Sequence, residues 1–295
     1  GFLLFRSLKQ QNKANKIILE QKNVVEDQKD ALEYKNREIL DSITYAKRLQ
    51  DAILPAVEYW HQTLPDSFIL YKPKDIVAGD FYWLETHTVS HETDSTTYLF
   101  FAAADCTGHG VPGAMVNIAG NALLRQIIRL EGLSDPAKIV ALLDLELTSL
   151  FNEHLTEGTT RDGMDLVFCK FNLTQMNGAF CGAGRPLILV REGQLVEFKK
   201  GPDAIGHASK ESKEFETIHF QLEKGDEFYL FSDGYTDQFG GENVKKFNRQ
   251  RFRNLLTSMS GFDAQKQKSE LIFHYNNWKG KQEQVDDICV VGIKI

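Results

Sequence analysis

The first part of the chain is a long polar stretch in which apolar residues recur at a regular interval. Between Leu3 and Leu54 there is no proline and no glycine, and Lys, Glu, Gln, Asn, Leu and Ile dominate, which predicts one long helix or two joined helices. Every seventh position is apolar or small: Ile18, Val25, Leu32, Ile39, Ala46 and Ile53. The companion positions three residues on stay polar until Leu49, so the pattern predicts a weak parallel coiled coil. A solvent-exposed spacer helix is the alternative.

Towards its end this helix becomes more apolar. Ile39, Ile43 and Leu54 belong to a broad stripe that needs a packing partner. Pro55 ends the helix. We therefore predict a helical linker over residues 1–54, a boundary between Leu54 and Asp66, and a second domain over residues 66–295.

Beyond the boundary, short apolar segments alternate with turn signals. Strands are predicted at 68–71, 81–86, 98–104, 165–171, 178–182, 187–191, 194–198, 215–221, 227–232 and 288–295, and helices at 114–130, 136–151, 249–259 and 263–278. The stretch 87–96 is predicted to be a hairpin loop, and Asp135 to cap the helix that Pro136 begins. Strands in runs and helices in pairs indicate an α+β fold with helices packed on antiparallel sheets.

Composition narrows the classes of protein. The 295 residues are 42% hydrophobic and 25% charged, enough for one large domain with an appendage. A net charge of −7 argues against nucleic acid as a partner. The four cysteines stand singly in apolar surroundings, which is typical of buried thiols in a reducing compartment and predicts neither a disulfide framework nor a zinc site.

The chain begins with the apolar residues 1–5, and Arg6 and Lys9 follow. Five residues cannot span a bilayer, which takes about 20. Basic residues after an apolar run are typical of the cytoplasmic end of a membrane helix, and an ordinary hydrophobic helix start is the alternative. We expect a cytoplasmic protein, or the cytoplasmic part of an inner-membrane protein that is tethered at 1–5.

Acidic residues recur at the ends of predicted strands. Asp105 ends an apolar strand before a turn with two glycines, and Asp80, Asp233 and the pair 286–287 occupy similar places. Acids at strand ends converge when the strands share a sheet, and buried carboxylates are costly unless cations neutralise them. The pattern therefore predicts a site for divalent metal, with the oxygen ligands that Mg²⁺ and Mn²⁺ prefer.

These segments resemble a known family in sequence and in order. They are Gly79-Asp80-Phe81-Tyr82, Asp105-Cys106-Thr107-Gly108-His109-Gly110, Ser232-Asp233-Gly234-Tyr235-Thr236-Asp237 and Asp286-Asp287. The resemblance is to the metal-dependent, PPM-type serine/threonine phosphatases, in particular their bacterial SpoIIE/RsbU-like branch, and it extends from about Arg48 to the C-terminus. It implies an αββα sandwich, two antiparallel β-sheets flanked by helices, preceded by a long N-terminal helix whose residues 48–55 resemble a regulatory switch helix.

The resemblance also implies a set of metal ligands. Asp105 would bridge two Mn²⁺ or Mg²⁺ ions, Asp80 and the backbone carbonyl of Cys106 would help hold one ion, and Asp233 and Asp286 would hold the other. A weaker third ion is implied at Asp237, and Asp165 is a further candidate ligand. Lys72 or Lys74 would replace the phosphate-binding arginine of the eukaryotic relatives. A metal-activated water would then attack phosphorus.

Three neighbouring residues have competing interpretations. His109 either protonates the leaving serine oxygen or ties down the glycine turn, and the second role is favoured. Cys106 is predicted to take no part through its thiol. Arg185, between Gly184 and Pro186, is predicted to lie in a hairpin turn at the surface.

The resemblance implies a signal-regulated protein phosphatase that hydrolyses phosphoserine or phosphothreonine on a partner protein. From the N-terminal helix itself we expect a homodimer through the coiled coil, with residues 43–54 repositioned against the domain as the means of regulation, and an upstream sensor domain. A coiled-coil-linked nucleotidyl cyclase and a catalytically silent phosphatase fold that serves as a binding module are the alternatives. Cyclic nucleotide formed from ATP or GTP with Mn²⁺ would favour the first, and EDTA-sensitive phosphate release would exclude the second.

Overall fold

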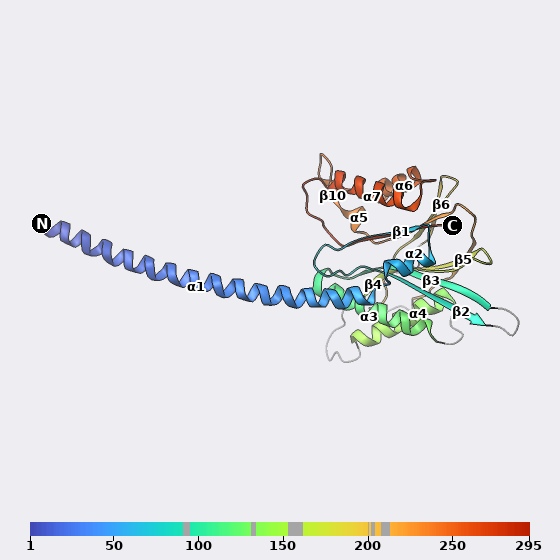
Figure 1. Cartoon of the computed structure of the whole chain (residues 1–295), viewed down its shortest axis with the longest axis horizontal. Helices are drawn as coiled ribbons and strands as arrows, with labels where there is room; N and C mark the ends of the chain where they lie inside the picture. The colour runs from blue at the N-terminus through green and yellow to red at the C-terminus, as the bar shows by residue number, and fades with distance from the viewer. Residues whose placement is uncertain (91–94, 131–133, 153–161, 200, 202–203, 208–212) are drawn as a thin grey trace. The chain divides into compact units, whose positions relative to one another are not determined.

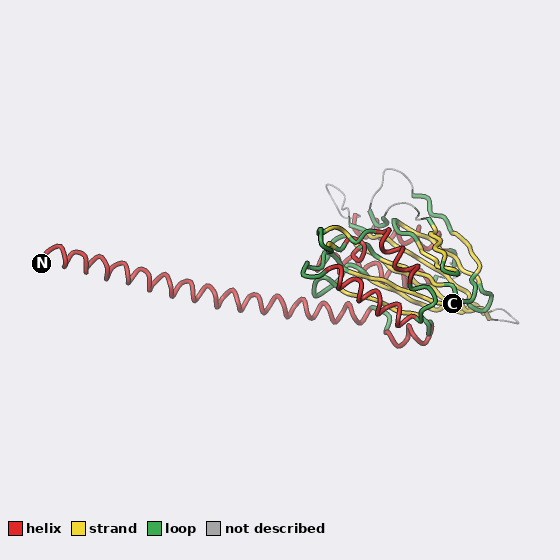
Figure 2. The backbone as a smooth tube through the Cα atoms, turned by 90° about the horizontal axis from the view of Figure 1, so that it is seen from above, coloured by secondary structure: helices red, strands yellow, loops and turns green. Residues whose placement is uncertain are grey.

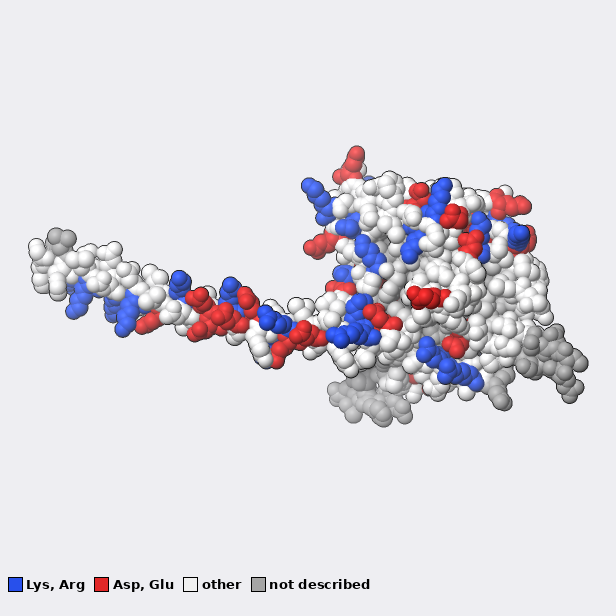
Figure 3. All heavy atoms as spheres, viewed as in Figure 1, with Lys and Arg blue, Asp and Glu red and all other residues white. Residues whose placement is uncertain are grey.

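A single helix, α1 (Phe2–Ile53), takes up the start of the chain in the computed structural model (Figure 1). The structure describes residues 1–90, 95–130, 134–152, 162–199, 201, 204–207 and 213–295. The chain divides into two units, Gly1–Lys47 and Arg48–Ile295. In the first unit the seam residues Ile18, Val25, Leu32 and Ile39 are 56–62% exposed. Basic side chains come first from the N-terminal end of the helix, and acidic ones join them further along (Figure 3). The prediction left open one long helix or two joined helices, and the structure has one.

The second unit starts inside the last turns of α1, earlier than the range 54–66 predicted for the boundary. Gln50 belongs to this unit and is buried. An additional short helix, α2 (Val57–Thr63), follows. Its Trp60 is buried, and the indole Nε1 donates a hydrogen bond to Ser67 Oγ at 3.0 Å. The end of the predicted linker, through Gln50, and the predicted boundary segment, through Trp60, are thus buried parts of the second unit.

Two five-stranded antiparallel sheets form the centre of this unit. The first has the order β1 (Ser67–Lys72), β12 (Ile288–Lys294), β9 (Glu227–Phe231), β6 (Leu187–Arg191) and β7 (Gln194–Phe198). The second has the order β2 (Phe81–Ser90), β3 (Ser95–Cys106), β4 (Met164–Asn172), β5 (Asn177–Ala183) and β8 (Ile218–Gln221). β10 (Phe239–Gly240) and β11 (Lys245–Lys246) make a separate short pair.

Helices cover the outer face of each sheet. Helices α3 (Gly110–Ile128) and α4 (Pro136–Asn152) pack on the second sheet, and α6 (Arg249–Ser258) and α7 (Ala264–Lys279) pack on the first. The one-turn helix α5 (Gly234–Asp237) follows β9. Figure 1 shows the four layers in order, and Figure 2 shows helices lying over the strands. The predicted αββα sandwich is confirmed.

Side-chain alternation along the strands produces three apolar clusters. Phe101 and Leu230 belong to the cluster between the two sheets. Phe168 packs with the α3–α4 side, and Tyr229 packs with the α6–α7 side. Neighbouring residues of one strand thus serve different layers, because successive side chains in a strand point to opposite faces.

Two local predictions were wrong. β2 continues to Ser90 and β3 begins at Ser95, so the described part of the predicted 87–96 loop is paired strand, and residues 91–94 lie outside the described residues. The hydroxyls of Thr88 and Thr97 lie 2.9 Å apart across this pair, and such cross-strand Thr pairs support strand pairing. β5 and β6 are consecutive but lie in different sheets, so residues 184–186 form a crossover and no hairpin.

Among the helices of the described chain, none has both the length and the apolar character that crossing a bilayer requires.

Candidate metal centre

Three of the predicted acids lie at one end of the second sheet. Phe81 pairs with Ala104, which places Asp80 beside the end of β3, and Asp105 pairs directly with Asp165 of β4. Antiparallel register therefore brings together residues that are far apart in sequence. Asp165 is the candidate whose position the sequence left most open, and it lies directly opposite Asp105.

The first sheet contributes acids at the same end. Phe231, two residues before Asp233, pairs with Val290, so the end of β9 lies beside the start of β12, where Asp286 is found. The backbones approach so closely that a Cβ on Gly234 would lie 1.9 Å from the carbonyl oxygen of Asp287. Only glycine fits there.

A direct contact joins the two sheets at this point. The backbone N–H of Asp233 donates a hydrogen bond to Asp105 Oδ2, with the nitrogen and oxygen 3.1 Å apart. The two principal predicted ligands, which are 128 residues apart in sequence, are therefore neighbours. The predicted convergence of strand-end acids is observed for this pair.

The electrostatics are those of crowded, poorly hydrated carboxylates. Burial raises the pKa of Asp80 well above its ordinary value, and the negative charge of Asp105 adds to the effect. Burial likewise raises the pKa of Asp105 to about 7, although the nearby Arg185 opposes the shift. The pKa of Asp286 is also raised, chiefly by burial. Such a cluster favours an added cation.

Arg185 lies inside this cluster, which corrects the prediction of a surface position. The residue is 4% exposed. Its Nη2 donates to Asp105 Oδ2 and to Asp233 Oδ2, the latter at 2.8 Å. Its Nε lies 3.0 Å from Asp165 Oδ2 as an ion pair, although the N–H is not aligned for a hydrogen bond. The residue is buried because the crossover between the sheets carries it past the ends of the strands.

Asp287 holds the loop before Asp80 in place. Its two oxygens accept hydrogen bonds from the backbone N–H groups of Lys74 at 2.7 Å and Gly79 at 2.6 Å. Its side chain is therefore occupied by protein donors, whereas the side chain of the neighbouring Asp286 accepts the Asp287 N–H at 2.9 Å. The two adjacent acids thus have different roles.

Gln50 of α1 and Asn117 of α3 bind the same loop. The Gln50 side chain donates to the carbonyl of Ala78 at 2.7 Å and accepts from its N–H at 3.0 Å. Asn117 Nδ2 donates to the carbonyls of Ala78 and Asp80. The backbone that positions Asp80 is therefore held by the last turns of α1.

The remaining candidates lie around the cluster. Asp237 is paired with Lys246 Nζ at 2.7 Å. Lys72 lies over the ring of Tyr275, and Lys74 is close enough to Asp286 to lower its pKa. Asp237 therefore stays a predicted ligand. Of the two lysines, Lys74 is the better placed to bind phosphate at the cluster.

The turn after Asp105 carries His109 and Cys106. His109 Nδ1 lies 2.7 Å from Asp75 Oδ2, and both side chains are exposed. Because this contact ties the glycine turn to the preceding loop, the geometry favours the structural interpretation of His109. Burial raises the pKa of the Cys106 thiol well above its ordinary value, which agrees with an unreactive side chain.

The donor atoms of this cluster bear on whether a divalent cation fits it. In the part of the chain that the structure describes, no three Asp, Glu, His or Cys side chains are gathered closely enough to hold a metal as they stand. However, Asp80 Oδ2 is buried without a hydrogen-bond partner, which is costly for a carboxylate oxygen. Hard oxygen donors with one unmatched buried oxygen suit Mg²⁺ or Mn²⁺.

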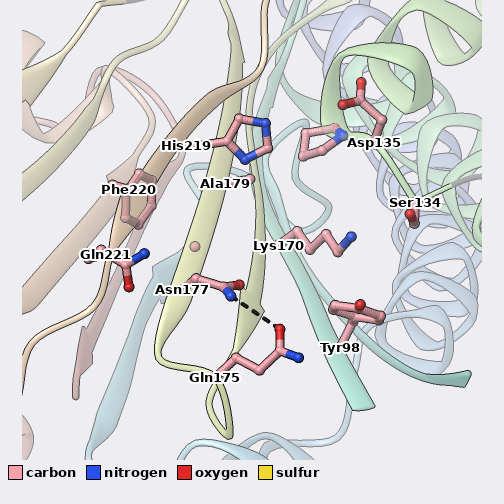
Figure 4. A pocket seen from close by; sticks show the side chains of 12 residues that line it. Tyr98, Ser134, Asp135, Lys170, Gln175, Asn177, Ala179, His219, Phe220 and Gln221 are labelled. Carbon is pink, nitrogen blue, oxygen red and sulfur yellow. Dashed lines mark hydrogen bonds between the residues drawn. The ribbon is translucent and has the colours of Figure 1, made fainter. Parts of the chain in front are cut away.

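A separate hollow of about 740 Å³ lies on the outer side of the second sheet (Figure 4). Lys170 of β4 extends towards the ring of Tyr98, with Nζ 4.0 Å from the ring centroid, and His219 lies on β8, with β5 between the two strands. Asp135, at its edge, caps α4 by accepting from the Lys138 N–H, as predicted. None of the predicted ligands lines this hollow.

Sequence reasoning missed three functional positions: Arg185, Asp287 as a loop anchor, and Gln50. Arg185 had one usable signal, because it stands between two continuous apolar strands and a charged residue there must be paired. The pair 286–287 marks both acids as strand-end residues, but nothing in the sequence distinguishes the anchor from the candidate ligand. For Gln50, which stands among the charged residues Lys47, Arg48 and Asp51, no signal in the sequence distinguished it from an exposed residue.

Comparison with known proteins gives consistent results. The profile of the family "Stage II sporulation protein E (SpoIIE)" matches residues 95–295. Among solved structures, the SiaA PP2C domain of Pseudomonas aeruginosa is 29% identical with a TM-score of 0.74, covering 88% of this chain and 98% of that one. Comparison with curated protein sequences gave no match.

Two more distant structures share the fold. The PP2C phosphatase domain of SpoIIE from Bacillus subtilis, with a fragment of its regulatory domain, is 18% identical with a TM-score of 0.60, covering 78% of this chain and 63% of that one. RsbX, solved in complex with magnesium, is 17% identical with a TM-score of 0.52, covering 78% and 94%. With the matched profile, the sandwich and the order of its strand-end acids, the chain belongs to the SpoIIE family and carries a PP2C-type serine phosphatase domain.

Proposed function

We propose that this protein is a metal-dependent protein phosphatase that hydrolyses phosphoserine or phosphothreonine on a partner protein. One observation carries the proposal: acids from both sheets meet, with Asp105 Oδ2 accepting the Asp233 N–H beside the buried Asp80. Buried carboxylates that approach one another are costly unless cations neutralise them. Family membership supplies the class of reaction.

The residues divide into ligands and supports. Asp105 would bridge two Mn²⁺ or Mg²⁺ ions, with Asp80 and the Cys106 carbonyl on one side and Asp233 and Asp286 on the other. When bound, a pair of divalent cations lowers the pKa of water and neutralises phosphoryl oxygens, the chemistry that phosphomonoester hydrolysis requires. Asp287 and Gln50 keep the loop of Asp80 in position through its backbone.

The test is Mn²⁺-dependent release of phosphate from a phosphoserine peptide by the full chain and by Asp105→Asn. We expect turnover to fall by at least about 100-fold, because the variant loses the carboxylate shared by both ions. Asp144→Asn is the matched control. Its side chain is 18% exposed against 19% for Asp105, and it also forms an ion pair, with Lys213.

Each outcome has a defined meaning. EDTA-sensitive turnover that is lost in Asp105→Asn and retained in Asp144→Asn supports the proposal. A full chain that binds Mn²⁺ but releases no phosphate would instead support a phosphatase fold that acts only as a binding module.

We further propose that α1 dimerises and regulates the domain. The seam residues from Ile18 to Ile39 are exposed, as expected for a surface that a second copy covers. Gln50, at the end of the same helix, contacts the loop of Asp80. An upstream sensor domain would act by changing the pairing of α1 and thereby the turns from Ile43 to Leu54.

A further inference from the structure

Arg185 is the one cation of the described residues that lies within the carboxylate cluster and contacts acids of both sheets. Asp105 and Asp165 belong to the second sheet, and Asp233 follows β9 of the first. The arginine side chain is 5% exposed, whereas that of Asp233 is 37% exposed. The guanidinium therefore lies on the inner side of the cluster, with the acids between it and solvent.

The backbone around Arg185 is built for this position. Gly184 has a φ of +71°, a conformation that suits glycine, and a Cβ there would lie 2.1 Å from Asp165 Oδ1. The carboxylate of Asp165 thus lies in the space that a side chain would fill. Pro186 then leads into β6 of the other sheet. This geometry aims the guanidinium at the strand ends.

The guanidinium and the proposed metal ions need the same atoms. Asp105 Oδ2 accepts both Arg185 Nη2 and the Asp233 N–H, and Asp233 Oδ2 accepts the same Nη2. An oxygen that accepts two hydrogen bonds has little capacity left for a cation. Two positive groups also repel each other strongly at such a separation in a poorly hydrated site.

We propose that Arg185 is an internal counter-ion that competes with divalent metal for Asp105 and Asp233, so that metal binding requires the guanidinium to give up these contacts. Arginine remains charged at all accessible pH values, so the competition is permanent. It stabilises the metal-free protein and weakens its affinity for metal. This inference rests on the proposed metal site and adds how its affinity is set.

The test is titration of the EDTA-stripped full chain with Mn²⁺ by isothermal calorimetry, with thermal unfolding of the same samples. In Arg185→Gln we expect the Kd for Mn²⁺ to tighten by about tenfold or more, since charge-assisted hydrogen bonds no longer have to be broken. The metal-free variant should unfold at a lower temperature than the metal-free wild type, and Mn²⁺ should stabilise the variant by more degrees.

Two variants separate this role from a structural one. Arg191→Gln removes an equally well paired arginine from the next strand, where it binds Asp226 and Glu223, and should lower stability without changing the Kd. Arg185→Lys keeps the charge but not the forked donor set, and should give an intermediate Kd. If Arg185→Gln does not fold, the Kd of Arg185→Lys serves as the test instead.

Equal or weaker Mn²⁺ binding in both Arg185 variants would overturn the inference and leave the proposed function standing. If the wild-type protein bound no Mn²⁺, or bound it equally well after Asp105→Asn, both the inference and the proposed function would be overturned.

Discussion

At the scale of single residues, neighbouring acids of the same type have different tasks. Asp286 and Asp287 follow each other, yet both oxygens of Asp287 accept backbone N–H groups of the loop that leads to Asp80. A carboxylate with two such bonds is a structural anchor. Precise placement of Asp80, a proposed ligand, therefore depends on a residue that we do not propose as a ligand.

This assignment predicts the effect of Asp287→Ala. Two buried or half-buried amides lose their acceptor, which should lower the free energy of unfolding by about 2 kcal/mol or more and weaken Mn²⁺-dependent turnover. Urea denaturation and phosphate release measure the two effects.

Asp226 supplies the control, because it too is buried and accepts a loop amide, that of Glu223, but lies outside the cluster. Asp226→Ala should lose stability while the folded fraction keeps its turnover. Equal turnover losses in the two variants would contradict a specific role for Asp287.

At the scale of elements, the end of α1 belongs to the phosphatase domain rather than to a linker. The side-chain amide of Gln50 donates to the carbonyl of Ala78 and accepts from its N–H, as a neighbouring strand would do in a sheet. A helix thereby holds a loop through one side chain. Any displacement of these last turns must break both bonds.

We predict that Gln50→Leu lowers the free energy of unfolding by about 1–3 kcal/mol, because the buried Ala78 N–H loses the acceptor that Gln50 supplies. Mn²⁺-dependent turnover should fall with it. Gln28→Leu, an exposed glutamine of the same helix, should change stability by less than about 0.5 kcal/mol. Similar losses in both variants would show that the helix, and not the Ala78 contact, is responsible.

The exposed seam of α1 gives a prediction at the same scale. Replacing Ile39 and Ile43 together by Lys should dissociate a dimer, measured by sedimentation equilibrium, and change turnover sharply while the metal ligands stay in place. Tyr34→Lys, at an exposed position off the seam, should do neither. Unaltered turnover in the double variant would count against regulation through α1.

At the scale of the whole molecule, the sandwich stores unfavourable electrostatic energy at one edge. Asp105 has a pKa of about 7 in the fold, against about 3.9 for an aspartate in an unfolded chain. Between these values the folded state binds more protons than the unfolded state, so the free energy of unfolding falls as the pH rises. The raised pKa of Asp80 acts in the same direction.

The metal-free protein should therefore lose stability relative to Asp105→Asn between about pH 4 and pH 7, by up to about 1.4 kcal/mol per pH unit. Mn²⁺ should remove most of this difference at pH 7. Urea denaturation of both proteins across this range, with EDTA or with Mn²⁺, measures it. Parallel stability curves for the two metal-free proteins would be inconsistent with a buried, protonated Asp105.

Sequence alone determined most of the elements and the fold class, and it supplied the acids that we propose as ligands. Alternation and helical periodicity are local properties, so strands such as β1 and β9 and helices such as α4 and α7 could be predicted from neighbouring residues. The motifs around Asp80, Asp105 and Asp233 were also readable, because a strand-end acid and its glycine turn lie within a few positions of each other.

Only the tertiary structure decided which strands share a sheet, and everything that follows from it. β5 and β6 are adjacent in sequence but belong to different sheets, so Arg185 is carried into the carboxylate cluster instead of into a surface hairpin. Gln50 and Asp287 acquire their roles from the backbone of loops distant in sequence. The physical reason is that burial and charge pairing are sums over neighbours in space, which no local pattern records.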